Sequence, residues 1–134
     1  QEVINWGATT THFIEPTGLS PKNVSSELDY AIITKEVYTN PIIQKASTMA
    51  QYKFITNNTK KSHTIKNTDK LLHISNFNIT GSKTGYIDES QYCLMVRVKN
   101  SSGKDIIAVT MGVDTRENSF NETERLLKYV LKNK

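Results

Sequence analysis

The chain of 134 residues contains one cysteine and no long hydrophobic run, and each scarcity excludes a class of protein. A single cysteine, Cys93, excludes an intramolecular disulfide, and its apolar neighbours indicate a buried, unreactive thiol. No apolar run approaches the roughly 20 residues that a membrane-spanning helix requires. The histidines His12, His63 and His73 lack metal-ligand spacing and neighbouring carboxylate clusters. We therefore expect no metal site and no cofactor.

The composition is that of one soluble globular domain, with 37% hydrophobic and 22% charged residues and a net charge of +4. Lysines crowd one polar segment beside two aromatic residues: Lys53, Lys60, Lys61, Lys66 and Lys70, near Tyr52 and Phe54. No nucleic-acid-binding motif accompanies them, so we interpret the segment as a solvated loop and expect no nucleic-acid partner. Attraction to an anionic cell envelope is equally compatible with this charge.

Two helices are expected in the first part of the chain. Residues 1–24 are punctuated by glycine and proline and predict an irregular segment. Ser25 is a candidate N-cap with Glu27 in the first turn, and broadly apolar residues follow. This helix should end near Asn40–Pro41, because proline disfavours helical geometry in the residue before it. A second short helix is expected over residues 41–46.

The strongest strand patterns come later in the chain. Residues 51–56 are compatible with a strand, and Asn57–Asn58 with a turn. Two later strands read as nearly continuous apolar runs, which predicts that both are central and covered on both faces. They are joined by a natural hairpin loop, Lys99–Lys104. The three strands expected in this region are Ile79–Tyr86, Gln91–Val98 and Asp105–Gly112.

The chain ends in a segment with strong helix signals. Ser119 with Glu122, or Asn121 with Glu124, offers a capping box. Apolar residues then recur at helical spacing. Together these patterns predict a single α+β domain, with an antiparallel sheet, flanking helices and a C-terminal helix.

Lys83, Thr84 and Gly85 form a K-T-G tripeptide, which is weak evidence of an active site on its own. It lies within "GSKTGYIDESQYCLMVRV", preceded by "THFIEPTGLSPKNVSSELDYA" and followed by "IIAVTMG" and "SFNETERLLKYVL". In this order the stretches resemble the serine-type D-alanyl-D-alanine carboxypeptidases, the low-molecular-mass penicillin-binding proteins. The resemblance implies a β-lactamase/transpeptidase-like fold, with residues 1–134 as the C-terminal portion of the catalytic domain.

The resemblance also implies a hydrolase acting outside the cytoplasm, in the periplasm or at the cell surface. In that family a serine is acylated by the terminal D-Ala-D-Ala bond of peptidoglycan stem peptides, or by a β-lactam, and water then hydrolyses the acyl-enzyme. Lys83 would supply a fixed positive charge, and Thr84 would hydrogen-bond the substrate carboxylate. Gly85 would let the substrate backbone lie against the strand. The backbone N–H of Tyr86 would form half of the oxyanion hole.

The rest of the family signature, S-x-x-K and S-x-N, should precede K-T-G. The copies present here, Ser101–Lys104 and Ser119–Asn121, follow it and fall in the predicted hairpin loop and at the last helix cap. We interpret both as chance matches. The nucleophile is then expected upstream of Gln1, on an N-terminal part of the domain that would be a partner of this chain. The 134 residues alone are expected to be inactive.

One departure from the family pattern concerns an arginine that many members carry immediately before the aromatic residue of the last helix. Here Ser119 precedes Phe120, and Arg116 is the candidate replacement for binding the substrate carboxylate. Two alternatives stay open. One is a related DD-endopeptidase or β-lactamase, because K-T-G is shared, and the other is a non-catalytic module that binds cell-wall peptide or a partner chain.

Overall fold

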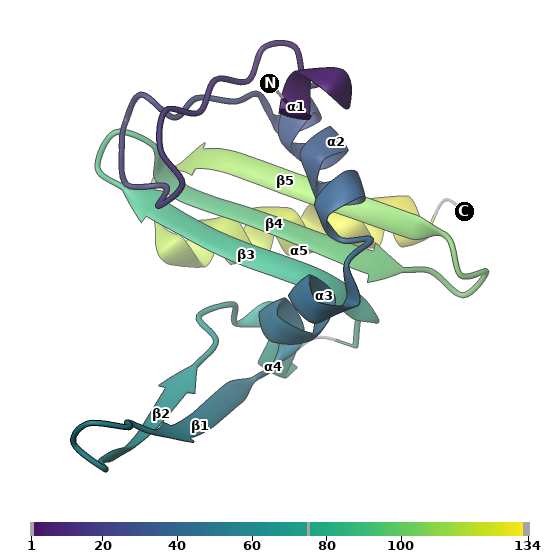
Figure 1. Cartoon of the computed structure of the whole chain (residues 1–134). Helices are drawn as coiled ribbons and strands as arrows, with labels where there is room; N and C mark the ends of the chain where they lie inside the picture. The colour runs from purple at the N-terminus through teal and green to yellow at the C-terminus, as the bar shows by residue number, and fades with distance from the viewer. Residues whose placement is uncertain (1, 75, 133–134) are drawn as a thin grey trace.

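A three-stranded antiparallel sheet forms the centre of the computed structural model, which describes residues 2–74 and 76–132 (Figure 1). The strand order is β3-β4-β5, and tight hairpins join successive strands. These strands match the three that the sequence predicts, so the expected antiparallel arrangement is confirmed. Their bounds are β3 (Ile79–Ile87), β4 (Gln91–Lys99) and β5 (Asp105–Val113).

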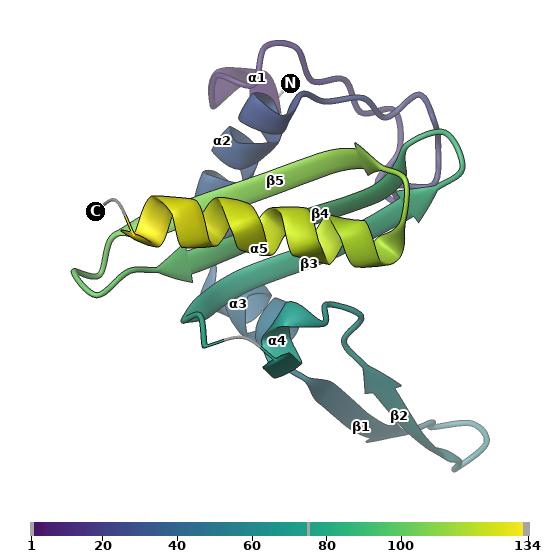
Figure 2. The same cartoon turned by 180° about the vertical axis from the view of Figure 1, so that it is seen from behind.

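Helices cover both faces of this sheet. Figures 1 and 2 show α2 (Glu27–Val37) and α3 (Pro41–Thr48) on one face and α5 (Arg116–Lys132) on the other. The α+β class with flanking helices and a C-terminal helix is therefore confirmed. In the part of the chain described here, no helix is long and apolar enough to cross a membrane.

Smaller elements lie outside this sandwich. The strands β1 (Gln51–Ile55) and β2 (Ser62–Lys66) pair with each other and project away from the sheet as a separate hairpin (Figure 1). The sequence predicts β1 and the turn that follows it, but it gives no signal for β2. The short helices α1 (Glu2–Asn5) and α4 (Leu71–Ile74) were likewise not predicted.

The core lies between the sheet and α5. Successive side chains of a strand point to opposite faces, so alternate residues of β4 (Leu94, Val96 and Val98) meet the helix. Phe120 and Leu127 of α5 pack on them, and all five side chains are at most 3% exposed. Burial of this apolar surface supplies the main stabilisation of the sandwich.

The start of α2 differs from the prediction by one residue. Ser26, not Ser25, is the N-cap, and its hydroxyl accepts a hydrogen bond from the backbone N–H of Asp29 at 3.2 Å. The Ser25 hydroxyl is instead 2.8 Å from that of Thr11. Two adjacent serines offer the same local signal, and a contact with a distant segment decides between them.

The start of α5 was also predicted wrongly. The helix begins at Arg116, and the hydroxyl of Thr115 accepts a hydrogen bond from the backbone N–H of Asn118 at 3.1 Å. Ser119 and Asn121 therefore lie inside the helix instead of capping it. The Asn118 side chain also donates to Asp114 at 2.9 Å, so residues just before the helix accept hydrogen bonds from its first turn.

The expected central position of β5 is wrong as well, because β5 is an edge strand of the described sheet. It packs against α2 on one face and α5 on the other. Packing on both faces accounts for the mostly apolar sequence of the strand, and a sequence pattern does not report whether its edge is paired. An apolar recess of about 380 Å³ runs beside it between the two helices, lined in part by Leu28, Ile107 and Leu126.

Strand β3 is clamped immediately before the K-T-G tripeptide. A Cβ atom added to Gly81 would lie 2.3 Å from the ring of Tyr38, so only glycine fits beneath that ring. The Tyr38 hydroxyl donates to the carbonyl of Ser82 at 3.1 Å. From the opposite face, the Ser82 hydroxyl donates to the buried carboxylate of Asp69. Both contacts position the strand that carries Lys83.

Gly81→Ala should lower the free energy of unfolding by about 2 kcal/mol or more, because the added methyl group overlaps the Tyr38 ring. Gly85→Ala is the matched control on the same strand. There the new Cβ would meet only the Cβ of Cys93, at 3.7 Å, and the change should be below about 1 kcal/mol. Urea denaturation of both variants measures the difference. Equal destabilisation by the two substitutions would contradict the clamp.

Candidate functional site

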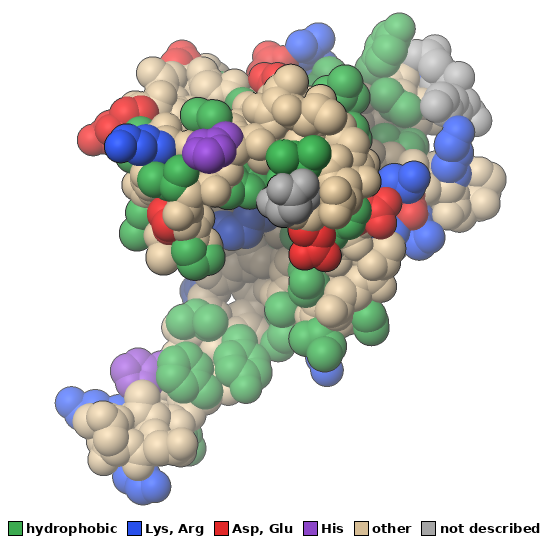
Figure 3. All heavy atoms as spheres, turned by 45° about the horizontal axis from the view of Figure 1, so that its top comes forward, with side chains coloured by type: hydrophobic (Ala, Val, Ile, Leu, Met, Phe, Trp, Pro, Cys, Tyr) green, Lys and Arg blue, Asp and Glu red, His purple; other side chains and the backbone are tan. Residues whose placement is uncertain are grey.

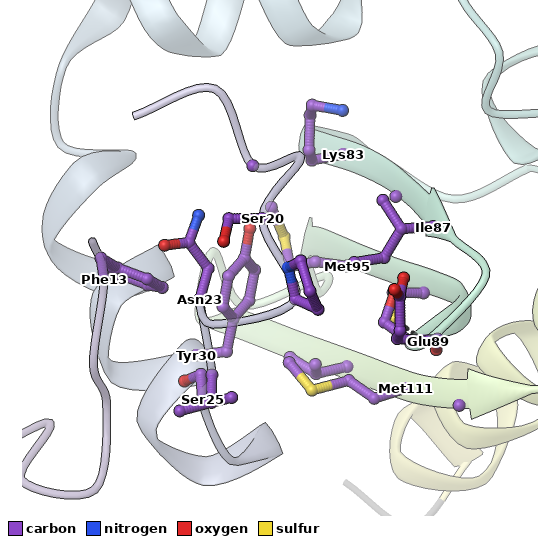
Figure 4. A pocket seen from close by; sticks show the side chains of 18 of the residues that line it. Phe13, Ser20, Asn23, Ser25, Tyr30, Lys83, Ile87, Glu89, Met95 and Met111 are labelled. Atoms are coloured by element: carbon purple, nitrogen blue, oxygen red, sulfur yellow. Dashed lines mark hydrogen bonds between the residues drawn. The ribbon is translucent and has the colours of Figure 1, made fainter. Parts of the chain in front are cut away.

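The K-T-G residues line a groove of about 1060 Å³ on the face of the sheet that carries α2 (Figure 4). One wall is the sheet, and the other is the loop of residues 13–25 together with Tyr30 of α2. Lys83 and Gly85 point to the same face because they alternate along β3. They pair with Met95 and Cys93 of β4, which also line the groove.

Lys83 lies at the edge of the groove with an exposed side chain (Figure 4). Its ammonium group donates to the backbone carbonyl of Thr84. Within residues 2–74 and 76–132, no carboxylate forms an ion pair with it. The positive charge is therefore available to an anionic ligand.

Thr84 begins a chain of contacts that leads to Arg116. The hydroxyls of Thr84 and Thr68 are 2.6 Å apart, and the Arg116 guanidinium donates to the backbone carbonyl of Thr68 at 3.0 Å. The guanidinium also lies over the ring of Phe120, 5.9 Å from its centroid. Arg116 is thus connected to the tripeptide but does not line the groove.

Gly85 is not required by the packing of the chain itself. The space for a Cβ is free apart from the ordinary contact with Cys93 at 3.7 Å. Its backbone has no positive φ angle, so any residue could adopt its conformation. The absence of a side chain at this position leaves room over the strand for a ligand.

The Tyr86 side chain points away from the groove. Its ring packs on Tyr92 with centroids 4.5 Å apart, and its hydroxyl donates to Asp88 at 2.8 Å. This hydrogen bond to a carboxylate raises the pKa of Tyr86. The backbone of Tyr86 lies between Gly85 and Ile87, and both of these neighbours line the groove.

The loop that forms the second wall is held by one carboxylate. Backbone hydrogen bonds between His12 and Val24, both 2.9 Å, close the loop. Inside it, Glu15 accepts from the hydroxyl of Thr17 and from the backbone N–H groups of Leu19 and Ser20, the last two at 3.1 Å. The hydrogen bond from the Thr17 hydroxyl foremost, followed by those from the backbone N–H groups of Ser20 and Thr17, lowers the pKa of Glu15 to about 2.

Neither of the serine motifs that follow K-T-G resembles a nucleophile site. Ser101 and Lys104 lie in the exposed turn between β4 and β5, where no helix brings them to a common face. Ser119 is 3% exposed, and its hydroxyl donates to the Arg116 carbonyl at 2.8 Å. The described residues also contain no cluster of three or more potential metal ligands.

Three supporting residues were missed by the sequence reasoning. Asp69 fixes Ser82, Thr68 contacts Thr84, and Tyr38 packs on Gly81. Each belongs to a polar or helix-end segment with no motif of its own. Asp69 lies close to the K-T-G stretch in sequence, but nothing in the sequence indicates that its side chain is fully buried.

A sequence model of the D-alanyl-D-alanine carboxypeptidase family matches residues 1–115. The chain belongs to this family. The D-alanyl-D-alanine endopeptidase of Escherichia coli is 30% identical over 126 residues, which are 92% of this chain and 40% of that protein. The chain thus spans less than half the length of this relative.

Solved structures share the fold. A mutant of a Streptomyces DD-transpeptidase superposes with a TM-score of 0.86 at 24% identity, over 96% of this chain and 50% of the other. A penicillin-binding protein from Listeria monocytogenes, in its cefotaxime-bound form, gives a TM-score of 0.78 at 24% identity. That match covers 95% of this chain and 51% of the other. These matches confirm the expected transpeptidase-like fold.

Protonation of Glu15 should loosen the wall loop. The folded-state pKa of about 2 lies below the ordinary value of 4.5, so the stabilisation is present above pH 4.5 and is lost as the pH falls through 2. The NMR shifts of the Leu19 and Ser20 amides should therefore titrate with a midpoint near 2. In Glu15→Gln this step should vanish. A midpoint near 4.5 would contradict the hydrogen-bonded loop.

Proposed function

We propose that this chain is part of a serine-type D-Ala-D-Ala carboxypeptidase, which removes the terminal D-alanine from peptidoglycan stem peptides through an acyl-enzyme. Membership of the family supports the reaction class. The observation that carries the proposal is that Lys83, Thr84 and Gly85 line one groove, where Lys83 has no ion-pair partner among the described residues and Gly85 is not demanded by packing.

Each residue of the tripeptide has a chemical role in this proposal. Lys83 attracts the carboxylate of the terminal D-alanine and polarises the serine of an S-x-N motif. Thr84 turns its hydroxyl from Thr68 to that carboxylate, and Arg116 strengthens the positive field through its link to Thr68. The peptide backbone lies against β3 over Gly85. The backbone N–H of Tyr86 donates to the oxyanion that forms when the carbonyl is attacked.

The attacking serine and its general base belong, in this proposal, to polypeptide outside the 134 residues. The relatives are about twice as long as this chain or longer, and the two serine motifs present are in a turn and inside a helix. Leu28, 73% exposed, and the apolar recess beside β5 offer a surface for that polypeptide to cover. The chain then forms the C-terminal portion of one catalytic domain.

A DD-endopeptidase is the second candidate, favoured by the name of the Escherichia coli relative. Both reactions begin with acylation by a D-alanyl peptide bond and place the same demands on K-T-G. Release of D-alanine from a pentapeptide, compared with cleavage of cross-linked dimers, distinguishes them. Either activity acts on the cell wall, so we propose a location outside the cytoplasm, in the periplasm or at the cell surface.

Labelling with a fluorescent penicillin tests the assignment. The product of the complete native reading frame should be labelled covalently, whereas the 134-residue chain alone should not. Lys83→Ala in the complete product should slow labelling by about 100-fold or more, because a preorganised positive charge at the acylation site is lost. Gly85→Ala should slow it by about tenfold or more while the fold is retained.

Lys104→Ala is the matched control, because Lys104 is an exposed lysine in the β4–β5 turn, and it should leave labelling unchanged. Labelling of the isolated chain would show that it contains its own nucleophile. A complete product that binds D-Ala-D-Ala peptide without ever being acylated would instead identify a non-catalytic binding module.

A further inference from the structure

The β1–β2 hairpin projects from the molecule as an arm, and all ten of its strand residues are exposed (Figure 1). Asn67 fixes its base: the backbone N–H donates to the Ala50 carbonyl at 2.9 Å, and the side-chain amide donates to the Ser47 carbonyl at 2.8 Å. A two-stranded hairpin that buries neither face is marginal in water. Contact with a partner on one face would stabilise the arm.

The two faces of the hairpin differ in chemistry because side chains alternate along each strand. The register pairs Tyr52 with Ile65 and Phe54 with His63, which places these four side chains on one face, called here the aromatic face. The opposite face, called the lysine face, carries Gln51, Lys53, Ile55, Ser62, Thr64 and Lys66. Lys60 and Lys61 lie in the connecting turn at the tip.

The positive charge of the chain is concentrated around this arm. Residues 37–68 contain five lysines and no acidic residue, whereas the other 102 residues contain 12 basic and 13 acidic residues. In Figure 3 the arm ends in lysine side chains, with a histidine beside apolar side chains behind them. The partner that this charge favours is anionic, and a second copy of the chain is disfavoured by repulsion.

The packing of the rings argues against stacking on a nucleotide base. Phe54 stacks with two rings nearly parallel to its own: Tyr52, with centroids 6.1 Å apart, and His63, with centroids 5.3 Å apart. These contacts already engage the Phe54 ring, so a nucleotide base would have to compete with them to stack on it. Ring edges and Ile65 form an apolar ridge, while the groove and the recess are lined by residues of other segments. Because this ridge projects and forms no pocket, it suits insertion into a lipid surface and not the enclosure of a partner's side chain.

We propose that the β1–β2 hairpin binds the surface of an anionic lipid bilayer. The aromatic face enters the boundary between headgroups and acyl chains, where tyrosine is well accommodated. Lys60 and Lys61 contact lipid phosphates from the tip, and the lysine face remains in water. This interaction is independent of the peptidase activity proposed above.

Vesicle flotation tests the interaction with the protein made from its native reading frame. It should bind vesicles with 30% phosphatidylglycerol at 0.1 M salt and not vesicles of phosphatidylcholine alone. Substituting both tip lysines (Lys60→Gln with Lys61→Gln) should weaken binding by about 25-fold, since each lysine near an anionic surface contributes about fivefold. Phe54→Ser should weaken binding by about tenfold.

Matched controls separate this site from bulk charge and general exposure. Lys22→Gln with Lys104→Gln removes the same charge elsewhere, and Ile55→Ser removes an apolar residue from the lysine face that is more exposed than Phe54. Both should change affinity by less than about twofold. Circular dichroism checks that each variant keeps its melting temperature. Should Phe54→Ser not fold, Ile65→Ser tests the same face.

Four results would overturn the proposal. They are no binding to the anionic vesicles, equal loss with either lysine pair, unchanged affinity in both Phe54→Ser and Ile65→Ser, and equal affinity for soluble polyphosphate. The last result would identify a general polyanion site and not a lipid surface.

Discussion

The position of β3 depends on a buried carboxylate. Asp69 is 0% exposed and accepts hydrogen bonds from the Ser82 hydroxyl and from the backbone N–H of Leu71, the latter at 2.9 Å. Burying a carboxylate costs free energy unless its oxygens accept hydrogen bonds, so Asp69 needs the Ser82 hydroxyl as a donor at this position. The preceding residue, Thr68, contacts Thr84. Two adjacent residues of one short segment thus fix the strand on both sides of Lys83.

The glycines of β3 show how one strand separates packing from binding. Gly81 and Gly85 face the same side of the sheet. Gly81 lies under Tyr38, whereas Gly85 opens to the groove. The first glycine is dictated by the fold, because any side chain would overlap a ring. The second is compatible with alanine in the fold, and the proposed function accounts for its lack of a side chain by the peptide backbone that lies over it. The sequence alone does not distinguish the two glycines.

The sequence was sufficient where local pattern determines structure. Apolar runs separated by turn residues located β3, β4 and β5, and the order of motifs located the tripeptide. It was insufficient where distant segments decide. The hydroxyls of Thr11 and Ser25 are hydrogen-bonded to each other, and Arg116 donates to the carbonyl of Thr68, 48 residues away in sequence. Strand β2 was missed for a different reason: every residue in it is exposed, so no hydrophobic alternation toward a core marks it.

Charge in the groove bears on how a peptide would lie there. Lys83 is the single basic residue among the described residues that line it, and the lining carboxylates are Glu15, Glu27 and Glu89. Glu15 is already engaged by the loop, whereas Glu27 and Glu89 repel an anion. Under the proposed function, the terminal carboxylate of a D-Ala-D-Ala peptide is directed to the Lys83 end. The lysines of the projecting hairpin lie outside the groove, and salt screens exposed charges over distance. Their positive field therefore leaves the preference of an anionic group for Lys83 unchanged.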